Sequence, residues 1–458
     1  MTIAQREATF AVENPATGEL IADVPDQGAA EALMALDRAV AAASDWATTA
    51  ARARGELLWR LLVLVERNRD ELASLLTSET GKSPQDAATE IAYAADFLRW
   101  FAEEAVRISG RYGSNPAGTG RVIVGYRPVG PCYLITPWNF PLAMATRKLA
   151  PALAAGCTAI VKPAELTPLT TIRLGTLARE AGIPTGVVNI VATSTPAEVT
   201  EALLSDPRLR KLSFTGSTPV GRRLLALAAR HVVSTSMELG GNAPFIVFED
   251  ADLDAAVDGA MQAKFRNSGQ ACTAANRFLV HETLLEPFTQ QVVQRVSAAT
   301  VGPLINSQAV ARLEALLADA VRRGARVLVG GRAVRGPGHY FEPTVVADVR
   351  PDCRLAQEEI FGPILAIGSF TREAEAVRLA NETEHGLVAY VYTGDLARAQ
   401  RLLEVLEVGM TGVNVGVVSD AAAPFGGIKA SGLGREGGAE GIHEYLETTY
   451  ALTADPFR

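Results

Sequence analysis

The chain has 458 residues, 48% of them apolar, and its 43 basic and 51 acidic side chains give a net charge of −8. At roughly 100–200 residues per domain this length predicts about two to four domains, and the apolar share excludes a largely disordered chain. The negative charge, without any long basic run, argues against a nucleic-acid-binding protein, which needs a face rich in Lys and Arg.

The four cysteines lie far apart and include no CxxC pair. We therefore expect neither a disulfide framework nor a cysteine-based zinc site, and a reducing cytoplasm is the expected location. The first ten residues do not have the charged and then apolar layout of a secretory signal, and no apolar stretch reaches the roughly 18 residues that a membrane span requires. Because the five histidines form no cluster with ligand spacing, no metal site is predicted.

The first third of the chain has a helical pattern. From Ala29 to about Ile108 the sequence is rich in alanine, with leucines three and four positions apart, and Gly81 to Pro84 interrupts it. We expect these helices to cover a sheet. The alternating segment from Arg121 to Tyr126 then predicts an antiparallel strand in a hairpin.

Short apolar segments alternate with amphipathic ones in the middle of the chain. Strands are predicted at 158–161, 187–191 and 211–214, and helices at 170–181, 198–204 and 220–229. This spacing predicts a parallel sheet covered on both faces, as in nucleotide-binding folds. A second α/β segment follows Glu238, with strands at 244–248, 278–281 and 326–331 and helices at 255–265 and 313–321.

Cys272 lies among small and polar residues in the segment NSGQACTAANR, after Gly269. A cysteine packed in a core normally has bulky apolar neighbours, whereas this one has room for a substrate. The local composition leaves two interpretations open, an inert thiol and a nucleophile. Only a few per cent of an ordinary thiol, with a pKa of about 8.5, is ionised at neutral pH, so an active Cys272 needs a base or a positive dipole nearby.

Two further polar residues lie where the chain leaves a strand. Glu238 precedes two glycines and is either a solvated strand terminus or a general base beside a cleft. Asn139 lies in a proline-bracketed loop, TPWNFP, where it either caps the following helix or donates to an oxyanion, a role typically worth about 10²–10³ in rate. The segment FTGSTPVG from Phe214 is either a pyrophosphate-binding helix start or a plain strand-to-helix turn.

Together these segments resemble the aldehyde dehydrogenase superfamily almost from end to end. The similarity is carried by motifs in the family's order: NPATGELI, KPAE, FTGS, MELGGNAPF, the Cys272 segment, EEIFGP and PFGGIKASGLGREGG. It implies an α/β fold with a Rossmann-like nucleotide-binding domain (1–109 and 128–240), a second α/β catalytic domain (241–432) and a small β oligomerisation element (110–127 and 433–458). It also implies a homodimer or homotetramer.

The same resemblance implies roles for individual residues. It makes Cys272 the nucleophile, Glu238 the general base and Asn139 the oxyanion donor. We expect NAD as the cofactor, because Glu165 can accept hydrogen bonds from both ribose hydroxyls and would repel a 2′-phosphate. NADP is the alternative, with Glu165 turned away and Lys162 binding that phosphate. The residues assigned to the cofactor are Trp138, Lys162, Glu165, Gly216, Ser217, Gly221, Leu239, Glu359 and Phe361.

A finer similarity is to the succinate semialdehyde dehydrogenases within that family, carried by AKFRNSGQ, GMTGVNVGVVS and TRK. It implies a substrate site of Arg147, Arg266 and Ser419 and a small aldehyde with a terminal carboxylate. A guanidinium offers a carboxylate bidentate, charge-assisted bonds that Lys cannot match, which supports this assignment. The alternative is that both arginines are structural or surface residues.

The implied reaction begins with attack of the Cys272 thiolate on the aldehyde. Oxidation by the nicotinamide gives a thioester, which water activated by Glu238 hydrolyses. The alternatives are a preference for glutarate semialdehyde, broad specificity, a CoA-acylating enzyme, which the retained Glu238 argues against, and a catalytically silent homologue. The chain departs from the family twice: the stretch 294–302 is short, which we expect to affect a surface connection more than the site, and no second cysteine follows two positions after Cys272.

Overall fold

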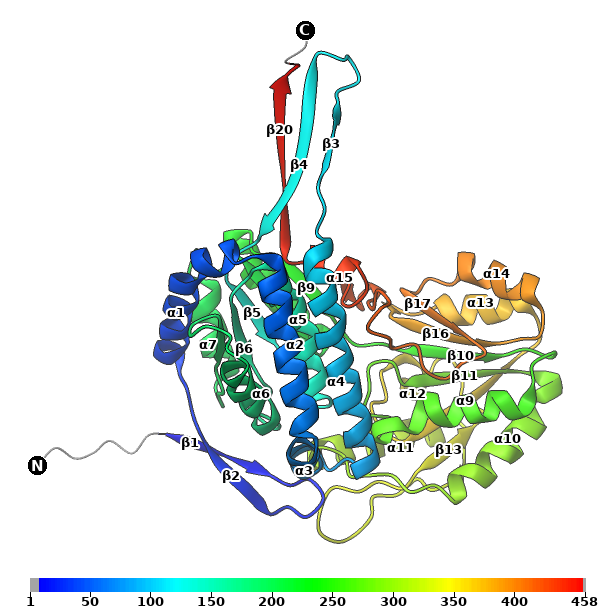
Figure 1. The fold of residues 1–458 in the computed structure, drawn as a ribbon. Coiled ribbons are helices and arrows are strands. Elements are labelled where there is room, and N and C mark those ends of the chain that lie inside the picture. The colour runs from blue at the N-terminus through cyan, green and yellow to red at the C-terminus, as the bar shows by residue number, and fades with distance from the viewer. Residues whose placement is uncertain (1–7, 456–458) are drawn as a thin grey trace, which may run out of the picture.

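The structure, a computed structural model, describes residues 8–455 and is built around two large sheets that lie side by side (Figure 1). The chain begins with an antiparallel pair, β1 (Thr9–Glu13) and β2 (Leu20–Pro25). Four helices follow, which are α1 (Ala29–Thr48), α2 (Ala51–Arg67), α3 (Arg69–Thr80) and α4 (Pro84–Glu104). The predicted break between α3 and α4 is confirmed: Gly81 ends α3 in the left-handed region, at φ +72°, and the Ser83 hydroxyl caps α4 by accepting from the Asp86 N–H.

The six-stranded sheet follows the helices and has a nucleotide-binding topology. Its parallel strands are β5 (Cys132–Ile135), β6 (Ala159–Lys162), β7 (Val188–Ile190), β8 (Lys211–Thr215) and β9 (Ser234–Glu238). The spatial order is β19-β9-β8-β5-β6-β7, in which β19 (Gly432–Leu433) is antiparallel. The strand order reverses between β5 and β8, and dinucleotides bind at the carboxyl ends of strands at such a switch point.

Helices cover both faces of this sheet, as the sequence predicts. They are α5 (Pro141–Ala155), α6 (Leu169–Glu180), α7 (Pro196–Leu204) and α8 (Thr218–Ala228), together with the four N-terminal helices. Helices α2 to α6 pack on the face that carries Cys132 and Leu134, whereas α1, α7 and α8 pack on the face that carries Tyr133 and Ile135. This alternation along β5 follows from the two-residue period of a strand.

The seven-stranded sheet contains β10 (Ala243–Val247), β11 (Ala275–His281), β12 (Arg326–Val329), β13 (Thr344–Ala347), β14 (Ile364–Phe370), β16 (Val388–Tyr392) and β17 (Met410–Val413). Its order is β12-β13-β14-β11-β10-β16-β17, and only β12 runs antiparallel to its neighbour. Its helices are α9 (Leu253–Phe265), α10 (Glu282–Ser297), α11 (Ser307–Arg322), α12 (Arg354–Gln357), α13 (Glu373–Asn381) and α14 (Leu396–Val405). Helices α9 and α10 pack on one face, and α13 and α14 on the other.

A third, antiparallel sheet extends away from the body of the molecule (Figure 1). It consists of β3 (Arg111–Ser114), β4 (Gly120–Pro128) and β20 (Leu446–Ala454) in the order β20-β4-β3, which confirms the predicted hairpin. The remaining elements are β15 (His385–Gly386), β18 (Ile428–Lys429), α15 (Glu440–His443) and three short 3-10 helices at Ala105–Arg107, Ala229–His231 and Arg266–Gly269. Among the helices of residues 8–455, none combines the length and the apolar character that crossing a bilayer requires.

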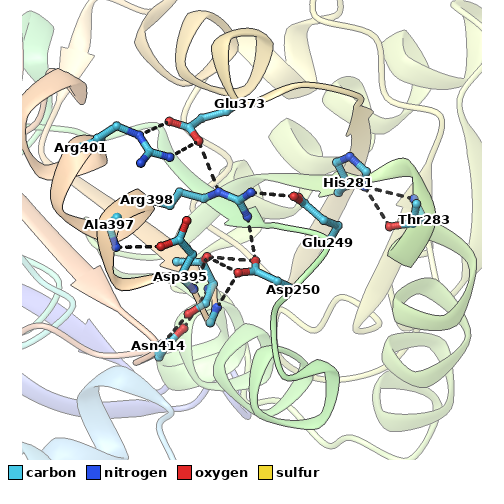
Figure 2. A network of polar contacts seen from close by, with 12 residues as sticks. Glu249, Asp250, His281, Thr283, Glu373, Asp395, Ala397, Arg398, Arg401 and Asn414 are labelled. Atoms are coloured by element: carbon cyan, nitrogen blue, oxygen red, sulfur yellow. Dashed lines mark hydrogen bonds and ion pairs between the residues drawn. The ribbon is translucent and has the colours of Figure 1, made fainter.

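A network of charged side chains joins α13 and α14 to the carboxyl end of β10 (Figure 2). The Arg398 guanidinium lies 2.6 Å from Glu249, 2.7 Å from Asp250 and 3.3 Å from Glu373, and Arg401 also binds Glu373 at 2.8 Å. Because only 14% of the Arg398 side chain is exposed, these contacts are less screened by water than ordinary surface pairs. The network fixes α14 at the end of the sheet opposite to Cys272, which precedes the parallel strand β11.

Candidate active site

A cavity with an empty volume of about 960 Å³, including its open mouth, lies between the carboxyl edge of the six-stranded sheet and the amino edge of the seven-stranded sheet. Most of the site residues predicted from the sequence line it, namely Trp138, Asn139, Arg147, Gly216, Ser217, Glu238, Leu239, Arg266, Cys272, Glu359, Phe361 and Ser419. Three predicted cofactor residues, Lys162, Glu165 and Gly221, are not part of its wall. The fold therefore brings together residues from both halves of the chain.

Cys272 lies in a sharp turn between α9 and β11. Asn267 and Ser268 have φ values of +50° and +57°, in the left-handed region, and both are buried. Side chains hold this turn against the segment before α11: Ser268 Oγ donates to the Gly302 carbonyl at 3.1 Å, and Gln270 Nε2 donates to the Pro303 carbonyl at 3.1 Å. The end of the short stretch 294–302 therefore supports the Cys272 turn directly and is more than the surface connection that we expected.

The Cys272 thiol is protonated in this environment. Its pKa is raised to about 12, mainly by burial; Arg147 and Arg266 oppose the shift, and Glu359 and Glu238 add to it. The charged form of a thiol is disfavoured where water is excluded, unless a partner accepts the proton. A base beside Cys272 would therefore increase the share of the thiol that becomes a nucleophile at neutral pH.

Glu238 lines the same cavity as Cys272 and is the candidate for that base. It is the last residue of β9 and is only 3% exposed, which excludes the solvated strand terminus. Neither of its carboxylate oxygens has a hydrogen-bond partner within residues 8–455. Burial, and then the negative charge of Glu436, raise the pKa of Glu238 well above its ordinary value, so that it keeps its proton to a higher pH than an exposed carboxylate does.

The two glycines after Glu238 allow the close approach that the sequence predicts. A Cβ atom at Gly240 would lie 2.7 Å from the Glu359 carboxylate, and one at Gly241 would lie 2.8 Å from the Cys272 carbonyl oxygen. The Gly241 N–H also donates to Glu359 Oε1 at 3.3 Å. A side chain at Gly241 would therefore push against the Cys272 segment, and one at Gly240 would push against Glu359.

Asn139 is directed at the Cys272 segment and does not cap a helix. Phe140 is the N-cap of α5 and provides no side-chain cap. The Asn139 side-chain Nδ2 donates to the Gln270 carbonyl at 2.9 Å, two residues before Cys272. An amide nitrogen carries two hydrogens, so one of them is left for an oxyanion formed at Cys272.

The two predicted substrate arginines have different surroundings. Arg147, in α5, is 2% exposed, lies with Nε 2.5 Å from Glu436 Oε2 and stacks 3.7 Å from the Phe425 ring centroid. Arg266 is partly exposed on the cavity wall, 5.8 Å from the Phe140 ring centroid, and has no carboxylate partner among residues 8–455. Both arginines line the cavity. The charge of Arg147 is balanced by Glu436, whereas the charge of Arg266 has no carboxylate beside it among residues 8–455.

Glu436 holds a second cation as well. Its Oε1 lies 2.5 Å from Lys148 Nζ, and although burial opposes the shift, the charges of Lys148 and Arg147 lower the pKa of Glu436. Glu436 is therefore ionised. It binds Arg147, and its negative charge also acts on Glu238.

Most of the predicted cofactor residues lie at the carboxyl edge of the six-stranded sheet, whereas Glu359 and Phe361 lie in the loop before β14. Ser217 begins α8, and its hydroxyl does not cap that helix. Thr215, at the end of β8, lines the cavity, and its buried hydroxyl has no hydrogen-bond partner within the described chain. Free backbone N–H groups at a helix start and an unpartnered hydroxyl fit a pyrophosphate and its ribose.

Lys162 and Glu165, which are not part of the cavity wall, lie at the carboxyl end of β6, beside β5. Lys162 ends β6 and is buried, with its Nζ 3.5 Å from Glu165 Oε2, and 45% of the Glu165 side chain is exposed. Burial lowers the pKa of Lys162. Gly221 has a packing role instead, because a Cβ atom there would lie 2.4 Å from Leu239 Cδ2.

An aromatic contact joins the two sides of the cavity wall. The rings of Trp138 and Phe361 meet edge to face with centroids 5.4 Å apart, so that the loop after β5 touches the loop before β14. No group of three or more His, Cys, Asp or Glu side chains suited to a metal ion occurs in residues 8–455.

The sequence reasoning missed several residues around the cavity. Tyr93, in α4, is the most informative, because its hydroxyl is buried and the residue lines the cavity beside Arg147 and Arg266. Helical spacing marks such a tyrosine only as a core residue. Lys148 and Glu436 were part of the quoted motifs, but no pattern in the chain pairs them.

Comparisons with known proteins agree with this geometry. A profile described as "Aldehyde dehydrogenase family" matches residues 2–451. The succinate-semialdehyde dehydrogenase of Paenarthrobacter nicotinovorans is 52% identical, over 96% of this chain and 100% of that protein, and the glutarate-semialdehyde dehydrogenase of Pseudomonas aeruginosa is 48% identical, over 96% and 93%. The crystal structure of an NADP-dependent enzyme from E. coli matches with a TM-score of 0.96 and 46% identity, covering 98% of this chain and 95% of that one.

Proposed function

Because the chain belongs to the aldehyde dehydrogenase family, we propose that it oxidises succinate semialdehyde, or a similar short aldehyde with a terminal carboxylate, to the dicarboxylate. The observation that carries the proposal is a single cavity wall that combines Cys272, Glu238 and Asn139 with two arginines. The names of the similar semialdehyde dehydrogenases support the same substrate class. The oxidant is NAD(P), as in the family.

The chain's own residues account for the acid–base and covalent chemistry. Ionised Glu238 accepts the proton of the Cys272 thiol, and the thiolate adds to the aldehyde carbon. Asn139 Nδ2 donates to the oxyanion that forms. When bound, NAD(P) supplies the nicotinamide ring that takes the hydrogen with its electron pair from that carbon. Glu238 passes the thiol proton to solvent and, ionised again, accepts a proton from the water that hydrolyses the thioester, and the Cys272 thiolate is released.

A panel of aldehydes tests the substrate class. Aldehydes of matched length, with and without the terminal carboxylate, are compared for kcat/KM with NAD and with NADP. Higher kcat/KM for the carboxylated members is expected, and the chain length with the highest value separates succinate from glutarate semialdehyde. Equal kcat/KM for charged and neutral aldehydes would contradict the proposed substrate.

Arg266→Ala is expected to raise KM for the carboxylated aldehyde by about 10- to 100-fold, because a charge-assisted hydrogen bond is worth about 1.5–3 kcal/mol. KM for the neutral analogue stays within about threefold, and steady-state kinetics measures both. Arg266→Lys is the control that keeps the positive charge but loses the paired N–H donors of the guanidinium. Equal losses on both aldehydes would remove Arg266 from the substrate site.

Arg147→Ala extends the same comparison. We expect a larger KM for the carboxylated aldehyde here too, but together with a loss of kcat on both aldehydes. The reason is that Arg147 also neutralises Glu436, whose charge acts on Glu238.

We assign the cofactor to the switch-point edge, with Gly216 and Ser217 at the pyrophosphate and Lys162 and Glu165 at the adenine ribose. Glu359 and Phe361 lie toward the nicotinamide, Trp138 lies at the edge of the cofactor, and Leu239 also binds it in this assignment. Gly221 acts by letting α8 pack closely. NAD is the preferred form in this assignment, because the Glu165 carboxylate repels a 2′-phosphate.

Glu165→Gln is expected to raise kcat/KM for NADP by about tenfold relative to NAD, equivalent to about 1.4 kcal/mol, the order expected from removing one like charge near the surface. The ratio of kcat/KM for the two cofactors measures the effect. Glu198→Gln, at an exposed glutamate in the first turn of α7, is the matched control and leaves the ratio unchanged. An unchanged ratio in Glu165→Gln as well would contradict the placement of the ribose.

We also propose three units and a homo-oligomer. Residues 1–109 and 128–240 bind the nucleotide, residues 241–432 are catalytic, and residues 110–127 and 433–458 join copies into a homodimer or homotetramer. Tyr112, Tyr450 and Leu452 support this role of the three-stranded sheet, since they are 68%, 65% and 54% exposed, and an apolar surface of this kind marks an interaction site. The four free cysteines agree with a reducing cytoplasm.

A further inference from the structure

A buried ion pair lies behind the loop that carries Asn139, outside the cavity wall. Lys82 precedes α4 and Glu90 lies in its second turn, and the two residues are 4% and 2% exposed. The Lys82 ammonium contacts Glu90 Oε2 directly. A buried ion pair is weak support for stability, because apolar side chains of similar size often serve as well. Another role therefore has to be considered for this pair.

Within residues 8–455, the further hydrogen bonds of these two side chains all go to the Asn139 loop and the start of α5. Lys82 Nζ donates to the Asn139 carbonyl at 2.9 Å and lies 4.5 Å from the Phe140 ring centroid. Glu90 Oε1 accepts from the N–H groups of Leu142 and Ala143, at 2.9 and 3.2 Å. Since Phe140 cannot cap α5 with its own side chain, Glu90 provides the missing cap from α4.

These contacts fix the backbone of Asn139 on both sides. Asn267 Nδ2 adds a second donor to the Asn139 carbonyl at 3.3 Å, which connects the loop to the Cys272 turn. With the main chain held, the Asn139 amide is directed at the Gln270 carbonyl at 2.9 Å. An oxyanion donor is effective only within about 0.5 Å of its productive position, so a small movement of this loop matters.

We propose that Lys82 and Glu90 form a positioning pair that holds Asn139 in the geometry that binds the oxyanion. The proposal rests on the function proposed above, in which Asn139 is the oxyanion donor. Neither Lys82 nor Glu90 lines the cavity, so neither contacts the substrate. They act on the reaction only through Asn139.

Lys82→Met tests the proposal, since it keeps the length of the side chain and removes the charge and the donor. We expect kcat to fall by about 10- to 100-fold, which is part of the 10²–10³ that an oxyanion donor typically supplies. KM for the aldehyde and for NAD(P) stays within about threefold. Because Lys82→Met leaves the charge of Glu90 without its cation, the double variant Lys82→Met/Glu90→Gln is measured as well, and we expect the same loss of kcat.

A double-mutant cycle with Asn139→Ala separates positioning from a general structural role. If Lys82 acts through Asn139, Lys82→Met has no further effect on kcat once Asn139 is removed. A multiplicative loss in the combined variant would overturn the positioning role. If Asn139→Ala alone leaves kcat unchanged, the oxyanion role in the proposed function is wrong instead, so the two failures are distinguishable.

Glu79→Gln is the matched control for loss of a buried helix-capping carboxylate. Glu79 is fully buried in α3 and accepts from the N–H groups of Leu169 and Thr170, at 2.7 and 3.1 Å, at the start of α6. The charge of Glu90 acts on Glu79, but Glu79 has no hydrogen bond to residues 139–143 in the described chain. We expect its kcat to stay within about twofold of the native value, and a loss equal to that of Lys82→Met would contradict the proposal.

Discussion

Replacing Cys272 by alanine lowers kcat by at least about 10⁴-fold for every aldehyde, as expected when the nucleophile of a catalytic unit is removed. Among the described residues, Cys272 is the one cysteine on the cavity wall, so no other thiol can take its place. Steady-state production of reduced cofactor measures the loss, and cofactor binding, followed by fluorescence, stays within about twofold.

Cys353→Ala is the control for this substitution, because Cys353 is a buried thiol at the start of α12, away from the cavity wall. We expect this variant to leave kcat unchanged. Alkylation gives an independent readout. With a thiol pKa of about 12, the rate of alkylation of the free chain rises about tenfold per pH unit through the neutral range, since the thiolate is the reactive form. Retention of turnover after Cys272 has been alkylated would contradict its assignment as the nucleophile.

Glu238→Gln is expected to release about one equivalent of reduced cofactor per site and then to stall. Glutamine cannot accept the proton of the hydrolytic water, so the steady-state rate falls by about 10²–10⁴-fold, while the thioester can still form once the thiol has lost its proton to solvent. Stopped-flow absorbance of the reduced nicotinamide measures the burst and the steady state together. Raising the pH accelerates the burst of this variant but not its steady state.

The native protein provides the pH control. Burial and Glu436 raise the pKa of Glu238, so the protonated and inactive form of this base is populated at higher pH than for an exposed glutamate. The native kcat therefore falls as the pH falls through that raised pKa, and Glu238→Gln removes this limb of the profile. A native kcat that is flat down to the ordinary range of a glutamate would show that Glu238 is not the base.

Much of the fold is predictable because its signals are local in the chain. The helix predicted at 170–181 is α6 (Leu169–Glu180), and the strand predicted at 211–214 is β8 (Lys211–Thr215), since periodicity, Gly182 and Gly216 act within a few residues. The order of motifs identifies the residues around Cys272 in the same way. None of these patterns measures a distance in space.

The remaining features depend on contacts between distant positions. Lys148 binds Glu436 across 288 positions and Lys82 binds Asn139 across 57, and no spacing rule connects either pair. The difference between Arg147 and Arg266 is of the same kind, because only the folded chain shows which of them already has a carboxylate. The raised pKa values of Cys272 and Glu238 follow from burial, which a sequence pattern indicates only approximately.

The left-handed turn at Asn267 and Ser268 makes the position of the Cys272 sulfur depend on a loop that is distant in the sequence. Non-glycine residues in this region of backbone space cost of the order of 1–3 kcal/mol each and persist only where surrounding groups hold them. Here the holders are the carbonyls of Gly302 and Pro303, more than thirty positions further along. Trimming or lengthening that downstream loop is thus expected to shift Cys272 even when both large sheets are unchanged. Any redesign of the loop has to be treated as a redesign of the site around Cys272.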